Sequence, residues 1–158
     1  MDGLGGFNRS EEYMSRSGYS DDCDGPELAM WRGAVSSAIR GRRGQSFLTE
    51  LIAALDALPE KRLGADALRD DDGDFCSLGC VGNSRGLDLA AIDPEDRDAV
   101  AAAFGIAPAM AAEVMFENDD DFDYSRRETP EARWGRMRQW AVEHLKTPNV
   151  NSTTPTVR

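Results

Sequence analysis

Two clusters of charged side chains could do chemistry in this chain, and they carry opposite charge. The acidic cluster lies in the segment ENDDDFDY and consists of Asp119, Asp120, Asp121 and Asp123. The basic cluster is Gly41-Arg42-Arg43-Gly44, which directly follows Arg40. A row of carboxylates can imitate phosphates and is attracted to basic surfaces. Guanidinium groups bind phosphate or carboxylate through paired hydrogen bonds. Both clusters therefore indicate binding.

Each cluster also has a plain structural interpretation. The acids can form a solvated loop whose charge is neutralised by the arginines of the next segment. The Arg pair can cap the exposed carbonyls at the end of a helix, where cations are favourable. We choose the acidic cluster as the site that binds a partner. We keep a candidate anion site, suited to a nucleotide or an acidic protein, at Arg40, Arg42 and Arg43.

The spacing of the potential metal ligands is poor. A zinc site of the Cys3His type would need four residues that are scattered along the chain: Cys23, Cys76, Cys80 and His144. The acidic segment RDDDGD at 69–74 does not fit a calcium loop, because Leu68 would occupy the first ligand position and Gly79 the place of the closing Glu. We expect no metal or cofactor, buried thiols, and a turn with local side-chain hydrogen bonds at 69–74.

The composition indicates an interaction protein rather than an enzyme. The 158 residues include 29 acids, 18 bases and one His, for a formal net charge of −11. A single His leaves little scope for acid–base catalysis, and no Gly-rich phosphate loop or nucleophile motif is present. Such a charge makes direct nucleic-acid binding unfavourable. No apolar run is long enough for a membrane span, so we expect a cytoplasmic protein with no membrane contact.

Apolar spacing predicts a mainly α fold, in one irregular bundle of about five helices. An apolar stripe at helical spacing follows Pro26, and a second one runs from about Gln45 to Leu58. A short β-hairpin is an option at 68–76. Asp93 and Thr129 are expected to be the N-caps of later helices. The predicted organisation is a flexible arm at 1–25, a helical domain at 26–146 and a disordered tail at 147–158.

The segment from Asp96 to Asn118 predicts a helix-turn-helix-like corner. Gly105-Ile106-Ala107 would be the turn, and small residues would let the two helices cross closely. A recognition helix needs cations or amides that face the DNA. Because the stretch from Pro108 to Asn118 has no cation, a structural helix pair is the preferred interpretation and a DNA-binding regulator the alternative.

Several strings resemble a family of uncharacterised small proteins encoded by tailed bacteriophages and prophages. They are YSDDCD, WRGAVSSAIRGRRGQ, LTELIAALDALPEKRL, CSLGC, IDPEDRDAVAAAFGIA, EVMFEND and TPEARWGRMRQW, and they cover roughly residues 19–140. The resemblance implies a phage origin and expression inside a bacterium, and it carries no catalytic residue.

Together these observations predict a phage-encoded acidic interaction protein whose partner, from host or phage, has a basic surface. One concrete version is the inhibition of a host nucleic-acid-binding defence complex through occupation of its basic surface. The alternatives are a helix-turn-helix-type DNA-binding regulator and a virion accessory protein.

Overall fold

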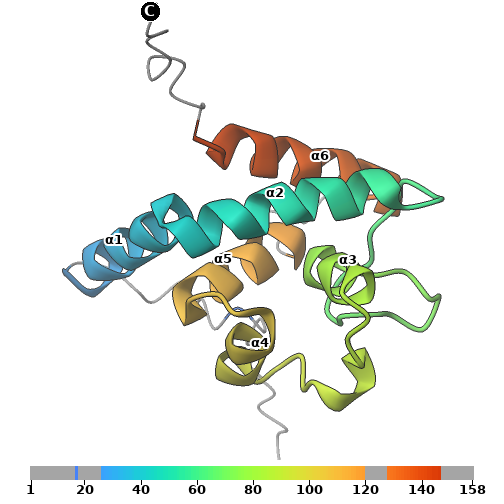
Figure 1. Cartoon of the computed structure of the whole chain (residues 1–158), viewed down its shortest axis with the longest axis horizontal. Coiled ribbons are helices and arrows are strands. Elements are labelled where there is room, and N and C mark those ends of the chain that lie inside the picture. The colour runs from blue at the N-terminus through green and yellow to red at the C-terminus, as the bar shows by residue number, and fades with distance from the viewer. Residues whose placement is uncertain (1–16, 18–25, 120–127, 147–158) are drawn as a thin grey trace, which may run out of the picture.

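The computed structural model describes Ser17, residues 26–119 and residues 128–146. These residues form no strand, which confirms the mainly α prediction. They form six α-helices and one short 3-10 helix: α1 (Pro26–Arg40), α2 (Arg42–Ala57), α3 (Ser77–Ser84), η1 (Leu89–Ala91), α4 (Arg97–Phe104), α5 (Pro108–Asp119) and α6 (Pro130–His144). They lie in one irregular bundle (Figure 1).

Helix α5 is the central element of the bundle. It contacts α1, α3, α4 and α6, and Figure 1 shows it surrounded by the other helices. Its sequence PAMAAEVMFEND is mostly apolar without a single apolar stripe, as expected of a helix that packs against neighbours on several sides. The buried residues on it are Ala109, Met110, Ala111, Ala112, Val114, Met115 and Asn118.

Helices α2 and α6 lie side by side over the core. The Trp134 indole N–H donates to the carbonyl of Leu55 at 3.0 Å. Arg138 donates two hydrogen bonds to the carboxylate of Asp56, at 2.6 and 2.9 Å. Gln45 joins three chain segments, because its amide donates to the Ile39 and His144 carbonyls and accepts from the backbone N–H of Lys146. The Gln45 contacts fix the start of α2, and the Trp134 and Arg138 contacts hold its end against α6.

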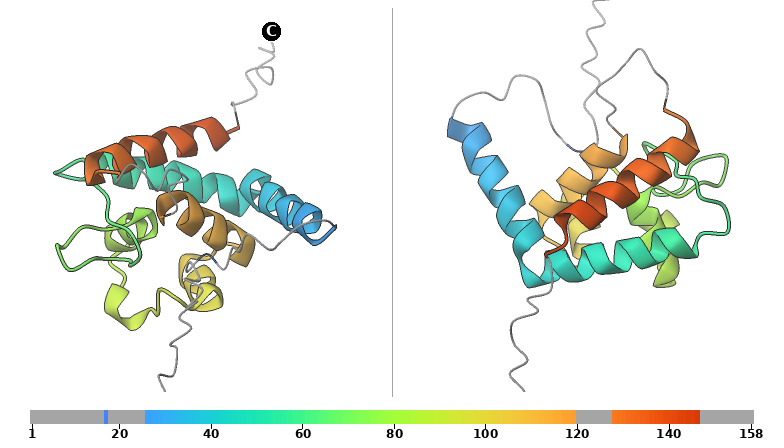
Figure 2. Two further views of the ribbon diagram at one scale, coloured as in Figure 1. Left: turned by 180° about the vertical axis from the view of Figure 1, so that it is seen from behind. Right: turned by 90° about the horizontal axis from the view of Figure 1, so that it is seen from above.

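The corner between α1 and α2 is tighter than predicted. Helix α1 ends at Arg40 and α2 begins at Arg42, so the two helices form a V around Gly41 (Figure 2). A side chain at Gly44 would lie 2.0 Å from the carbonyl oxygen of Ala38, so only Gly permits this approach. The interpretation of the Arg pair as a cap for the end of α1 is therefore wrong. Arg42 and Arg43 are in the first turn of α2, where cations are unfavourable.

The optional hairpin at 68–76 is not formed. This segment has one isolated antiparallel bridge, between Arg69 and Phe75. The Asp70 carboxylate accepts from the backbone N–H of Asp74 at 2.8 Å, and Gly73 has a φ of +85°. The predicted turn with local side-chain hydrogen bonds is confirmed. Only five residues lie between Arg69 and Phe75, and the strand-like pairing is limited to this one bridge.

The structure confirms one of the two predicted N-caps and corrects the other. Thr129 caps α6, since its hydroxyl accepts from the backbone N–H of Ala132 at 3.1 Å. Asp93 instead closes a turn by accepting from Glu95 N–H at 2.9 Å. Asp96 caps α4, and its carboxylate accepts from Ala99 N–H at 3.0 Å. The chain offers two Asp residues before α4, and the second is the one at which the helix begins.

Helices α4 and α5 form the predicted corner and are bent by 105°. This value lies within the range of about 90–120° between the helices of helix-turn-helix motifs. Gly105, the C-cap of α4, has a φ of +66°, which favours glycine. Within the described ranges no single helix is long and apolar enough to cross a membrane, and only α4 and α5 together meet that length and composition.

A candidate anion-binding pocket at the start of helix α2

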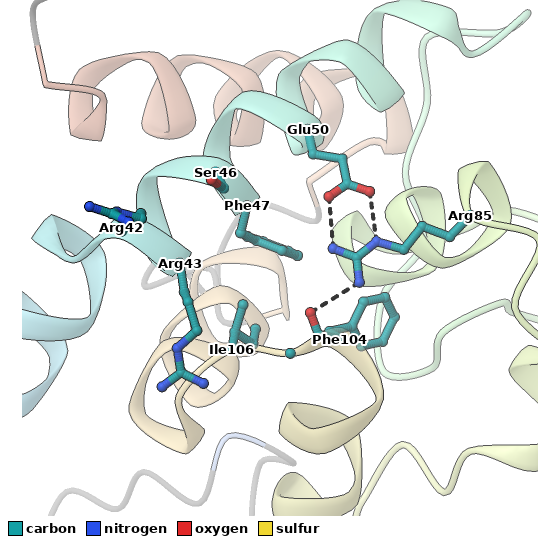
Figure 3. A pocket seen from close by; sticks show the side chains of 9 residues that line it. Arg42, Arg43, Ser46, Phe47, Glu50, Arg85, Phe104 and Ile106 are labelled. Atoms are coloured by element: carbon teal, nitrogen blue, oxygen red, sulfur yellow. Dashed lines mark hydrogen bonds and ion pairs between the residues drawn. The ribbon is translucent and has the colours of Figure 1, made fainter.

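A hollow of about 250 Å³ lies where the first turns of α2 meet the end of α3 and the α4–α5 corner. Figure 3 shows it from close by. We call it the arginine pocket. Its lining residues are Arg42, Arg43, Ser46, Phe47, Glu50, Arg85, Phe104, Gly105 and Ile106.

The apolar side chains that line the pocket belong to the core. Phe47, Phe104 and Ile106 are 1%, 2% and 4% exposed. Phe47 comes from the buried face of α2, and the other two flank Gly105 at the end of α4. The pocket therefore has a rigid apolar floor, because each of these side chains is held by the packing of the bundle.

An ion pair closes one side of the pocket. The Arg85 guanidinium donates to both carboxylate oxygens of Glu50, at 2.6 and 2.7 Å, and to the carbonyl of Phe104 at 3.0 Å. These hydrogen bonds hold the pKa of Glu50 below its ordinary value and raise the pKa of Arg85. Arg85 also lies over the Phe104 ring at 5.8 Å. The Arg85–Glu50 ion pair therefore forms one wall of the pocket, and its two charges neutralise each other.

The other side of the pocket is cationic and exposed. Neither Arg42 nor Arg43 has a carboxylate partner among the described residues, and both are exposed. In Figure 3 Arg43 points down toward the α4–α5 corner and Arg42 points away from Phe47. Gly41, the N-cap of α2, supplies no side-chain cap. The positive end of the helix dipole adds to the two unpaired guanidinium groups, so this side attracts anions.

The structure brings together two of the three residues predicted for anion binding. Arg42 and Arg43 line the arginine pocket, whereas Arg40, in the last turn of α1, does not. Sequence reasoning missed the Arg85–Glu50 wall, because these residues are 35 positions apart. No local pattern links them.

Most of the predicted acidic cluster lies outside the described residues, namely Asp120, Asp121 and Asp123. Asp119 is the last residue of α5, and its carboxylate accepts from Asp66 N–H at 3.1 Å and from the Asn118 side chain at 2.8 Å. The expectation that all four acids belong to a solvated loop is therefore wrong for Asp119, which helps to anchor the end of α5.

The described thiols belong to the core. Cys76 and Cys80 are buried and free, and the Cys76 sulfur caps α3 by accepting from Gly79 N–H at 3.4 Å. Burial, together with the neighbouring Cys76, raises the pKa of the Cys80 thiol. The described residues contain no group of three or more His, Cys, Asp or Glu side chains that could hold a metal. Cys23 lies outside the described residues.

Comparison with known proteins gives no relative from which a function could be transferred. No protein-family model, no curated protein and no solved structure matches the chain.

Proposed function

We propose that this protein works by contact and binds an anionic group of a macromolecular partner in the arginine pocket. The observation that carries the proposal is the pair of exposed guanidinium groups of Arg42 and Arg43, which have no described carboxylate partner. They lie beside an apolar floor at the positive end of α2. Two unpaired cations that border a hollow favour an anion with at least two oxygen atoms, such as a carboxylate or phosphate.

The proposal includes no catalytic step. General acid–base catalysis requires a group whose pKa lies near the working pH. The carboxylate in the pocket, Glu50, has its pKa lowered by hydrogen bonds from Arg85, which moves it away from neutral pH. The floor residues Phe47, Phe104 and Ile106 offer contact area and no reactive atoms. This supports binding as the function of the pocket.

Burial of α5 makes a DNA-binding regulator a weaker candidate. The second helix of a helix-turn-helix motif inserts one exposed face into the major groove. Most of α5 is buried, and its half-buried residues include the acids Glu113, Glu117 and Asp119. A groove lined by phosphates repels such a face.

The second candidate keeps the acidic cluster as the contact site. The net charge of −11 favours a partner with a basic surface. In the setting that the phage resemblance implies, this partner is a host or phage protein in the bacterial cytoplasm. Inhibition of a host nucleic-acid-binding defence complex is then the function, and a virion accessory role is the alternative.

Affinity capture from bacteria that express the tagged protein separates the two candidates. The double variant Arg42→Gln/Arg43→Gln removes the exposed cations of the pocket. The triple variant D120N/D121N/D123N removes the acids of the cluster and keeps Asp119, which stabilises the end of α5. Arg32→Gln is the matched control, because Arg32 is an exposed Arg of α1 outside the pocket.

We expect the double variant to lose a partner that the triple variant and the control retain. Loss of the partner in the triple variant alone would favour the acidic candidate. A partner retained by both variants would contradict both proposals.

A further inference from the structure

A second hollow adjoins the arginine pocket. It has a volume of about 270 Å³ and shares Arg42 and Arg43 with the pocket. Its other lining residues are Ser37, Ala38, Gly41, Gly44 and Ala107. The two hollows meet at Arg42 and Arg43, and we call them together the arginine groove. The groove runs from the last turns of α1 to Arg85.

The groove combines apolar and cationic surface in a fixed order. One end has the aromatic and aliphatic floor of Phe47, Phe104 and Ile106. The middle has the exposed guanidinium groups of Arg42 and Arg43. The other end is lined by small residues, so that a chain can come close to the backbone there. This order suits an elongated ligand that has an apolar group on one side of a single negative charge.

We propose that the arginine groove binds an extended acidic peptide segment of a partner protein. An Asp or Glu of this segment contacts Arg42 and Arg43, and an apolar side chain two residues away rests on the floor of the pocket. Side chains two residues apart lie on the same side of an extended chain. The inference rests on the proposed function and names its ligand class.

The wall of the pocket favours a carboxylate over a chain of phosphates. The Arg85 guanidinium already donates to both Glu50 oxygens and to the Phe104 carbonyl, which leaves it little capacity for another anion. The Glu50 side chain is 35% exposed. A nucleic-acid backbone that passed along the groove would bring successive phosphates to this carboxylate, and like charges repel. A peptide with one acid avoids that contact.

A selection of random heptapeptides displayed on phage, with the full-length protein as bait, tests the inference. A parallel selection with the Arg42→Gln/Arg43→Gln variant identifies peptides that bind elsewhere on the protein, and these are discarded. We expect the enriched peptides to contain Asp or Glu two positions from Leu, Ile, Met or Phe. Enrichment of peptides without acids, or no enrichment over the variant, would overturn the inference.

Fluorescence anisotropy with one enriched, labelled peptide then measures the two contacts. We expect a loss of affinity of about tenfold or more for the double variant and for the peptide with Asn in place of Asp, which is a typical cost of removing one partner of a charge pair. Replacing the apolar residue of the peptide with Ser should also weaken binding, and the Arg32→Gln control should keep wild-type affinity. Equal affinity of the Asp and Asn peptides would contradict the carboxylate contact.

A labelled fifteen-nucleotide oligothymidine completes the test. We expect no binding at physiological salt. Binding that depends on Arg42 and Arg43 would overturn the peptide inference but leave the proposed anion contact intact. Conversely, if affinity capture shows no role for the two arginines, the proposed function itself fails. The two failures are therefore distinguishable.

Discussion

At the scale of single residues, one buried amide joins three parts of the fold. Asn118 is 1% exposed. Its carbonyl oxygen accepts from the backbone N–H and the hydroxyl of Ser77, each at 2.9 Å. Its amide nitrogen donates to the Gly64 carbonyl at 3.0 Å. The side chain thus ties the end of α5 to the start of α3 and to the loop before it.

Replacing Asn118 with Ala should be strongly destabilising. The substitution leaves two donors and one acceptor buried without a partner, and we expect a loss of about 2–4 kcal/mol in the free energy of unfolding. Urea denaturation measures it. Asn83→Ala is the matched control, because Asn83 is exposed, and its effect should stay within about 0.5 kcal/mol. Equal effects of the two substitutions would show that the Asn118 network adds no stability.

A half-buried carboxylate on α5 makes stability depend on pH. Burial, and then the neighbouring Glu113, raises the pKa of Glu117, although Arg136 and His144 act in the opposite direction. A carboxyl whose pKa is higher in the folded state favours folding below its unfolded pKa of 4.5 and loses this contribution as pH rises through the folded pKa. At pH 7 the charged Glu117 is therefore less favourable than a neutral side chain.

The Glu117→Gln variant should melt about 2 °C above the wild type at pH 7. The difference should shrink as pH falls and disappear well below pH 4.5, where Glu117 is protonated in both states. Thermal unfolding of both proteins, followed by circular dichroism at several pH values, measures the difference in melting temperature and its dependence on pH. A constant difference across this range would rule out titration of Glu117 as its cause.

At the scale of elements, two helices carry an exposed Gly in their interior. Gly33 in α1 and Gly135 in α6 are exposed, and a side chain at either position would meet nothing within 4 Å. A helical Gly costs about 0.5–1 kcal/mol relative to Ala. The packing of the bundle therefore does not require Gly at either position.

Gly33→Ala and Gly135→Ala should therefore each stabilise the fold by about 0.5–1 kcal/mol. Urea denaturation midpoints test this expectation. Gly44→Ala is the contrasting variant and should destabilise the fold, because its side chain would lie 2.0 Å from the Ala38 carbonyl oxygen. A fall in stability for Gly33→Ala or Gly135→Ala would contradict the account of these helices.

The helices that could be predicted from the sequence have long apolar stripes and strong end signals. Thr129-Pro130 gives the start of α6, and the stripe that includes Phe47 and Leu51 gives the body of α2. Helix α3 is too short for a period, contains two glycines and is capped by a cysteine sulfur, which is not a favoured cap. It was therefore not among the predicted helices.

The candidate site was predictable only in part, for a similar reason. The Arg42–Arg43 pair was visible because its two residues are adjacent in sequence. The Arg85–Glu50 wall and the Phe104 floor depend on the packing of α3 and α4 against α2, which no local spacing encodes. The second apolar stripe was expected to begin at about Gln45, whereas α2 begins at Arg42 and Gly44 allows the close approach of α1.

At the scale of the whole molecule, the two exposed arginines of the groove, Arg42 and Arg43, lie in a stretch of sequence without acids. The stretch from Leu28 to Thr49 has four arginines and no carboxylate, although the whole chain has a net charge of −11. A local positive field persists over a Debye length of about 8 Å in the cell. The negative remainder repels large polyanions at greater distance. This distribution favours a small acidic segment over a nucleic acid.

The most direct test of the central claim is an NMR titration of the arginine Nε–Hε signals with a capped tetra-aspartate peptide at 150 mM salt. The account predicts saturable shifts at Arg42 and Arg43. Arg138, whose guanidinium is held by Asp56, serves as the internal reference and should stay unchanged. Shifts of similar size at all exposed arginines, or no shift at Arg42 and Arg43, would contradict the anion-binding role of the pocket.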